Sequence, residues 1–519
     1  MDQEMQIAEI HNDGASVADD ERFLQPDVLV LHPFNEDILL MLKNNDPSVI
    51  GVRIDEDTTI KGAGRIIAES KLLRKMDIYV GTNEMTRRGE FWCGLACNRS
   101  IESLFLASVR VKTDLEEIMR VITPFFEEND NLQCIQYHSH EPEALSSLSN
   151  MLANYNNDSL KRIRLFSSRA IDQLQAEFFD SLKRLHSLME LSCGGFDMGR
   201  MGCFALANLL RNPASNITLL ILDETEIDDE GIAVLTSAFI VNSANGTRNS
   251  LRTLGITGDT NVTGTDWIVF SSFISHPMCL LENLRIETTE IHDRELICLG
   301  AALNVNQSVK HLDLGQNLVN ISTRGWRGFA ICLSSRQSAL EELNLSGCDV
   351  TSDGAIEIVT ALAGNSRLTT LHLSPPNDDD RYSERVWQSL KCLLCDTTSI
   401  ESTFFSNHTL HSLVVYDLME NVMSLLEMNR GVNKSEVARQ KIMAHHFSGD
   451  TTNLHMFVHM QEAILPFALE WIGRNNLGFS LMFSLVQELA PTLVDFRRCC
   501  VTERRCMSGA LDDGNEHLL

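Results

Sequence analysis

The sequence lacks the features of a membrane, secretory or nucleic-acid-binding protein. No stretch of about 18 uninterrupted apolar residues occurs in the 519-residue chain, so we expect no membrane span. The N-terminal MDQEMQIAEIHNDGASVADDERF has neither a basic start nor an apolar centre, and no secretory signal is expected. Basic residues are outnumbered: 43 Lys and Arg stand against 71 Asp and Glu, which gives a net charge of −28. We therefore expect no nucleic-acid partner, because neutralising phosphates requires a concentrated basic face.

Signatures of common enzymes are also absent. The chain contains no GxxxxGK[ST] phosphate loop, no HExxH and no GxSxG. Cys392 and Cys395 form a lone CxxC inside an apparent helix, and without a second pair we interpret both as core residues. His138 and His140 lack the helical spacing of a metal-binding pair. We therefore predict no catalytic residue, no metal site and no cofactor.

Cysteine, by contrast, is plentiful. The 14 residues are scattered, and Cys193 and Cys348 stand where a repeating pattern takes a small apolar residue. Free cysteine packs as a small hydrophobe, and a reducing compartment keeps it free. Together with the missing signal, this predicts a cytoplasmic protein, with the nucleus as the alternative.

That repeating pattern is a frame of an aliphatic residue, two variable residues, a second aliphatic, one variable residue and a third aliphatic. Clear copies are LEELNL, VKHLDL and LTTLHL. The spacing of the copies indicates an array of repeats, which presents one long surface and favours binding over catalysis. The first positions of the thirteen copies are 49, 73, 101, 132, 160, 188, 217, 251, 281, 309, 340, 368 and 400.

Each repeat is predicted to contain a strand, a turn and a helix. The last frame positions alternate with period two, which is typical of a strand. The segment GAIEIVTALAGN before Leu368 has helical periodicity and places Ile356, Val359, Leu362 and Ala363 on one face. Adding parallel strands on one side and bulkier helices on the other curves such a stack, with the strands on its concave face.

The extended frame LxxLxLxx(N/C)xL, at 28 to 31 residues with a full helix, resembles leucine-rich repeats of the ribonuclease-inhibitor type. In that family, the position of Asn317 and Cys348 hydrogen-bonds neighbouring loop backbones. The resemblance implies an α/β leucine-rich-repeat solenoid, a curved horseshoe with helices on its convex face. SIESTFFSNHTLHSL, residues 399–413, is also similar to the end of uncharacterised leucine-rich-repeat proteins of diatoms.

The patterns divide the chain into five parts. Residues 1–22 are acidic and expected to be disordered, and residues 23–48 are predicted to form an N-terminal cap. Residues 49–415 hold about thirteen repeats. Residues 416–498 contain four helical patterns and are interpreted as a helical C-terminal cap, with an appended partner-binding module as the alternative. Residues 499–519 are expected to be a flexible tail.

The variable positions 3, 5 and 7 of each frame are predicted to face the concave side. Their charges nearly balance, but several carry large apolar side chains that no repeat core requires, Phe404 among them. Aromatic residues beside arginine are typical of interface hot spots. The alternative is that these side chains only stack on neighbouring strands. The predicted partner-binding residues are Tyr79, Phe105, Arg162, Arg164, Phe166, Glu190, Leu219 and Ile221.

These observations predict a non-enzymatic protein–protein interaction scaffold that binds a protein partner on its concave face. A monomer is expected, with a cap-mediated dimer as the alternative. The alternative functions are a GTPase-activating or a ubiquitin-ligase-associated regulatory protein that uses the solenoid for recognition. The acidic tail that typically follows the repeats of the first class is missing, and the terminal cysteines lie beyond the last predicted helix, where a ligase could not preorganise them.

Overall fold

The computed structural model describes residues 31–446, apart from short gaps at 57, 59–60, 82–83, 109–114, 140, 156–157, 168–170, 245–249, 259–263, 290, 318–320, 376–380 and 416–417. The chain forms two compact units. Unit 1 comprises Met1–Asp197 and Ala214–Ile217, and unit 2 comprises Met198–Pro213 and Thr218–Leu519.

Unit 1 alternates strands and helices from β1 to β7. Each strand pairs in parallel with the next strand in the chain, so the order in the sheet is the order in the sequence. Its strands are β1 (His32–Pro33), β2 (Gly51–Ile54), β3 (Lys75–Val80), β4 (Ser103–Ser108), β5 (Cys134–Ser139), β6 (Arg162–Ser167) and β7 (Glu190–Gly194). Its helices are α2 (Glu36–Lys43), α3 (Ala63–Glu69), α4 (Glu84–Cys97), α5 (Leu115–Val121), α6 (Thr123–Glu128), α7 (Pro142–Asn154), α8 (Asp172–Ser181) and the 3₁₀ helix η1 (Leu182–Arg184).

Unit 2 follows the same scheme from α9 to α19. Its strands also pair in parallel in chain order. They are β8 (Leu219–Asp223), β9 (Thr253–Thr257), β10 (Asn283–Glu287), β11 (His311–Asp313), β12 (Glu342–Leu345), β13 (Thr370–Leu373) and β14 (Ser412–Val414). The helices are α9 (Arg200–Arg211), α10 (Asp229–Ala244), α11 (Gly264–Ile274), α12 (Asp293–Val305), α13 (Thr323–Phe329), α14 (Ile331–Ser334), α15 (Ser352–Ala361), η2 (Leu362–Gly364), α16 (Glu384–Leu394), α17 (Ile400–Phe404), α18 (Glu420–Asn429) and α19 (Lys434–His446).

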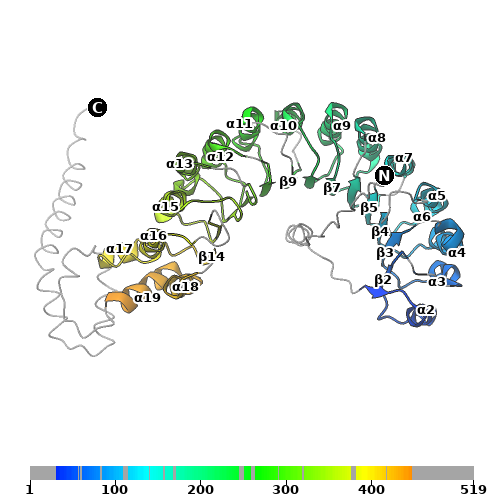
Figure 1. Cartoon of the computed structure of the whole chain (residues 1–519), viewed down its shortest axis with the longest axis horizontal. Helices are drawn as coiled ribbons and strands as arrows, with labels where there is room; N and C mark the ends of the chain where they lie inside the picture. The colour runs from blue at the N-terminus through cyan, green and yellow to red at the C-terminus, as the bar shows by residue number, and fades with distance from the viewer. Residues whose placement is uncertain are drawn as a thin grey trace, which may run out of the picture. The chain divides into compact units, whose positions relative to one another are not determined.

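Within each unit, the helices cover one face of the sheet and leave the other face bare of described helices (Figure 1). Such strand–helix units form parallel sheets because each helix returns the chain to the start of the next strand. We call the bare side the strand face. The predicted α/β architecture of parallel strands with helices on one side is therefore confirmed.

The core lies between the strands and the helices. The three aliphatic frame positions are buried, as in Leu340, Leu343 and Leu345, each at most 1% exposed. On α15 the buried face includes Ala355 and Ile358. The predicted face was only partly right, because Ile356 is half-buried and Ala363 is exposed.

The first twelve frames coincide with strands, but the thirteenth was wrong. Ile400 begins helix α17, whose N-cap Ser399 accepts a hydrogen bond from the backbone N–H of Ser402. The last strand is β14, and the residue that starts its frame is the buried Leu410. Phe404 therefore belongs to a helix and not to the strand face.

A row of buried asparagines joins consecutive repeats. Each lies three residues before the first aliphatic position of a frame. Asn365 illustrates the bonding: its side-chain amide donates to the carbonyl of Leu333 in the preceding repeat (2.6 Å), and its Oδ1 accepts from the backbone of Arg367 and Leu368. We call the set the asparagine ladder: Asn98, Asn129, Asn306, Asn365 and Asn407.

The loop position that the resemblance singled out is also confirmed. Asn317 donates to the carbonyl of Ile286 on the preceding strand (2.7 Å) and accepts from the N–H of Thr289 (2.8 Å). Cys348, the equivalent residue one repeat later, donates its thiol hydrogen to the carbonyl of Leu314 (2.8 Å). These bonds satisfy loop backbone groups that the strands leave unpaired.

At the C-terminal end of the described chain, α19 contacts the last repeat. Lys441 is fully buried; its ammonium group donates to the carbonyls of Leu394 (2.5 Å) and Asn407 (3.3 Å). Two of the four helical patterns predicted in residues 416–498 correspond to α18 and α19. The remainder of the predicted cap (447–498), the tail (499–519) and the N-terminal segment (1–22) lie outside the described residues. None of the helices that the structure describes is long and apolar enough to cross a membrane.

Candidate functional site

The strand face of unit 1 carries a band of half-buried aromatic side chains. Because side chains alternate along a strand, every second residue of β3 to β6 points away from the core. Tyr79 and Phe105 meet edge to face with ring centroids 5.5 Å apart. His138 and Phe166, which are paired residues of β5 and β6, do the same at 4.5 Å. We call these four residues the aromatic band.

Contacts with neighbouring side chains hold the aromatic band in place. The guanidinium carbon of Arg53 lies 4.6 Å from the centre of the Tyr79 ring, a cation–π distance. Phe166 covers Gly195, where φ is +67° and an added Cβ would lie 2.8 Å from the ring. These side chains therefore do stack on residues of neighbouring strands, as the alternative prediction holds. Tyr79, Phe105 and Phe166 nevertheless all remain half-exposed.

Charged side chains flank the band. Arg162 and Arg164 occupy alternate positions of β6, and Glu190 is the register partner of Arg162 on β7. All three are half-buried. Burial raises the pKa of Asp77, against the opposing charges of Lys75 and Arg53. The predicted residues of unit 1 therefore share one face of the sheet, and the register brings Arg162, Phe166 and Glu190 onto adjacent strands.

Two predicted site residues are not accessible. Leu219 and Ile221, on β8 of unit 2, are only 7% and 3% exposed. Gly255 on β9 is the register partner of Ile221, and an added Cβ there would lie 2.7 Å from Ile221 Cδ1. Because Gly255 has no side chain, Ile221 can lie flat against the sheet. We therefore exclude Leu219 and Ile221 from the candidate binding surface.

The strand face of unit 2 is polar instead of aromatic. Arg285 and Glu287 form a buried ion pair at 2.7 Å on β10. Burial raises the pKa of Glu287 to about 7, and the carboxyl group of Asp313 adds to the rise. The Thr257 hydroxyl donates to Asp223 on the adjacent strand. These groups are largely satisfied by one another and are therefore interpreted as structural.

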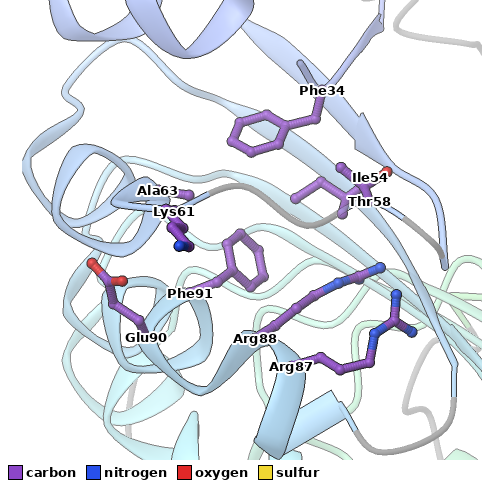
Figure 2. A pocket seen from close by; sticks show the side chains of 9 residues that line it. All are labelled: Phe34, Ile54, Thr58, Lys61, Ala63, Arg87, Arg88, Glu90 and Phe91. Atoms are coloured by element: carbon purple, nitrogen blue, oxygen red, sulfur yellow. The ribbon is translucent and has the colours of Figure 1, made fainter. Parts of the chain in front are cut away.

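A second candidate site is a cavity of about 300 Å³ in unit 1 (Figure 2). It lies at the carboxyl end of β2, next to the start of α3 and the first half of α4. Figure 2 shows two phenylalanine rings on one side and two arginine side chains on another. The sequence patterns did not single out this cavity, because its walls come from three separate segments. Its lining residues are Phe34, Ile54, Thr58, Lys61, Ala63, Arg87, Arg88, Glu90 and Phe91.

Burial makes several of the described cysteines poor nucleophiles. Burial raises the pKa of the Cys193, Cys332 and Cys395 thiols, which disfavours the nucleophilic thiolate. Cys395 is a core residue as predicted, but its CxxC partner Cys392 is exposed. Across the part of the chain that the structure describes, no group of three or more His, Cys, Asp or Glu residues is arranged to hold a metal ion.

The parallel strand–helix repeats, their length and the loop bonds of Asn317 and Cys348 define a leucine-rich-repeat solenoid. Sequence comparison agrees: the chain is similar to a ribonuclease inhibitor and to other leucine-rich-repeat proteins. It is 26% identical over 232 residues to the ribonuclease inhibitor of Mus musculus, covering 45% of this chain and 46% of that protein. It is 28% identical over 202 residues to NACHT, LRR and PYD domains-containing protein 14 of Mus musculus, covering 39% of this chain and 19% of that protein.

Other comparisons add less. NACHT, LRR and PYD domains-containing protein 5 of Homo sapiens is 28% identical over 201 residues, covering 38% of this chain and 16% of that protein. A chain of the yeast Rad7 and Elc1 complex is 14% identical with a TM-score of 0.41, covering 78% of this chain and 94% of that chain. No family model matches. The similarity to diatom proteins stays a prediction.

The matched segments span less than half the length of these relatives. The fold and the relatives together point to a protein-interaction or recognition module. Which partner is recognised, and on which surface, does not follow from them.

Proposed function

We propose that this chain is a non-enzymatic scaffold that binds a protein partner through the strand face of unit 1. The observation that carries the proposal is the aromatic band with its flanking arginines. The proposed binding residues are Tyr79, Phe105, Arg162, Arg164, Phe166 and Glu190.

The composition of this surface supports a protein ligand. Aromatic and arginine side chains contribute most of the affinity at protein interfaces, because they bury large areas at a small entropic cost. Here the rings are already held by their neighbours, Tyr79 between Arg53 and Phe105, and Phe166 between His138 and Gly195. A preordered surface loses little conformational entropy when a partner binds.

The rigid strands that carry these side chains also support the proposed binding surface. The binding side chains lie on strands β3 to β7. Strands β3 to β6 are paired on both sides, and β7 is paired with β6. The surface mixes both signs of charge, with Arg162 and Arg164 near Glu190. This composition favours a partner with exposed apolar residues and some acidic ones over a uniformly basic ligand.

The test is a triple variant, Phe105→Ala, Arg164→Ala and Phe166→Ala, in the full-length protein. Quantitative affinity purification from the native cell should recover at least one specific partner with the wild-type chain and at least about tenfold less with the variant, because two hot-spot truncations alone cost about 2 kcal/mol or more.

The chain offers a matched control on its helix side. Arg200 lies over the ring of Phe204 at 5.5 Å on α9 of unit 2, so Arg200→Ala with Phe204→Ala removes an equivalent cation–π pair from a helix instead of a strand. This control should retain the partner. Equal recovery by the triple variant and the wild type, with both folded by circular dichroism, would show that the strand face of unit 1 is not the binding surface.

A further inference from the structure

The cavity at the carboxyl end of β2 has an apolar side. Phe34, Ile54 and Phe91 line it, and each is at most 7% exposed to solvent. In Figure 2 the rings of Phe34 and Phe91 both lie on the side away from the two guanidinium groups. Such walls favour the apolar part of a ligand, because water displaced from them is released to bulk.

The other side of the cavity is cationic. Arg88 is only 5% exposed, and its Nη2 donates to the backbone carbonyls of Asp55 (2.6 Å) and Glu56. These bonds fix the guanidinium group against the loop after β2. At Arg88 the backbone of α4 also departs from helical geometry, with φ −131° and ψ 20°. The neighbouring Arg87 is exposed at the same end of the cavity.

The balance of charge around the cavity is positive. Its lining contains Lys61, Arg87 and Arg88 against one carboxylate, Glu90. Figure 2 shows Glu90 projecting to the side opposite the two guanidinium groups. The lining therefore has more cationic than anionic side chains, and its guanidinium groups lie beside the loop of Asp55 and Glu56. Cationic side chains in a cleft favour an anionic ligand.

We propose that this cavity binds a small organic anion, a carboxylate or a phosphate monoester on an apolar body of about one ring. Its volume of about 300 Å³ is at the lower end of the range for small-molecule sites. Arg87 and Arg88 would receive the anionic group, because guanidinium groups match the geometry of carboxylate and phosphate oxygens. The rings of Phe34 and Phe91 would hold the apolar body.

The cavity is separate from the proposed partner-binding residues, which lie on strands β3 to β7. A failure of one proposal therefore leaves the other standing.

Isothermal titration calorimetry of the full-length protein tests the proposal with four probes. Phenyl phosphate and benzoate present both features, inorganic phosphate presents the charge alone, and benzyl alcohol presents the ring alone. We expect phenyl phosphate, benzoate or both to bind more tightly than inorganic phosphate and benzyl alcohol. The tighter of the two ring-bearing anions identifies which anionic group the site prefers.

Arg87→Gln should weaken the binding of the preferred probe by at least about tenfold, because it removes a charged hydrogen-bond donor without touching the buried Arg88. The control is Arg65→Gln, which removes an exposed arginine paired with Glu69 on the adjacent α3. That control should bind as the wild type does. The triple variant of the strand face should also retain binding.

Three results would overturn the proposal. One is the absence of binding by both ring-bearing anions at millimolar concentration. Another is an equal loss in Arg65→Gln and Arg87→Gln, which would indicate a general charge effect. The third is binding of inorganic phosphate as tight as that of the preferred ring-bearing anion, which would leave the apolar wall without a role.

Discussion

Glu287 is a carboxyl group that holds its proton at a pH where an ordinary glutamate has lost it. Burial raises its pKa to about 7, and the nearby Asp313 adds to the rise, whereas the ion pair with Arg285 opposes it. Burial has the larger effect because an uncompensated charge in the protein interior is costly. With a pKa of about 7, Glu287 is protonated in part of the folded molecules near neutral pH.

The raised pKa predicts a pH dependence of stability. Between the ordinary pKa of 4.5 and the folded value of about 7, the folded protein binds more protons than the unfolded chain. The stabilisation is present in full below pH 4.5 and is lost as the pH rises through about 7. Glu287→Gln should therefore flatten the fall in the free energy of unfolding between about pH 5 and pH 7.5, measured by urea denaturation.

A neighbouring carboxylate provides the control for this prediction. Glu282 precedes the same strand and is paired with Lys310 at 3.0 Å in a half-exposed position. Glu282→Gln should keep the wild-type slope. An unchanged slope in Glu287→Gln would mean that its carboxyl group does not hold the proton in the folded state.

For single residues, the sequence predicted on which face of the sheet a side chain lies better than it predicted how deeply that side chain is buried. The two-residue period correctly placed Tyr79, Phe105 and Phe166 on the strand face, because alternation is a property of the strand itself. It did not predict the burial of Ile221, which depends on a glycine 34 residues later in the chain, Gly255. The binding role of the six remaining residues stays a prediction.

Among the helices, two glycines allow α3 and α4 to pack closely against each other. An added Cβ at Gly94 would lie 2.0 Å from the carbonyl oxygen of Gly64, and one at Gly64 would lie 2.0 Å from that of Glu90. Backbone atoms cannot rotate aside as a side chain can, so either addition would force the helices apart. This contact lies beside the cationic cavity.

Gly94→Ala should therefore destabilise the protein by about 1–3 kcal/mol, because overpacking moves the backbone. Thermal and urea denaturation would measure the loss. Gly89→Ala is the matched control: it lies in the same helix, and an added Cβ would meet nothing within 4 Å. That substitution should be neutral or stabilise by up to about 1 kcal/mol, because alanine is the better helix former. Equal stability of the two variants would show that α3 and α4 can separate without cost.

The order of elements was largely predictable, since the aliphatic frame appears in every repeat. The thirteenth frame failed because only its first position, Ile400, is aliphatic, and Ser399 caps a helix there. A better signal was present in the sequence. The asparagine three residues before Leu410, Asn407, belongs to the asparagine ladder and marks the true start of the last strand. The cavity could not be predicted in this way, because no short motif contains Phe34, Lys61 and Arg87 together.

At the largest scale, each described repeat within a unit contacts the next one along the chain. In such arrays, stability is close to a sum of local terms, and a defect is felt mainly by its neighbours. The chain should therefore open locally, with different parts protected to different degrees.

Hydrogen exchange of the Gly94→Ala variant tests this expectation. Backbone amides of β3 and β4, beside the altered helix pair, should exchange faster than in the wild type. Amides of β11, β12 and β13 in unit 2 should keep their wild-type rates. A uniform increase along the chain would instead indicate one cooperative unit, contrary to the expectation.

The asparagine ladder also has a mechanical consequence. Each of its side chains fastens one repeat to the one before it, as Asn365 does to the carbonyl of Leu333. Under a pulling force applied to the chain ends, these hydrogen bonds would break one repeat after another instead of all together. A repeat of 28 residues releases about 95 Å of extended chain when it unfolds. Under force, the protein would therefore lengthen in steps of about that size, one repeat at a time.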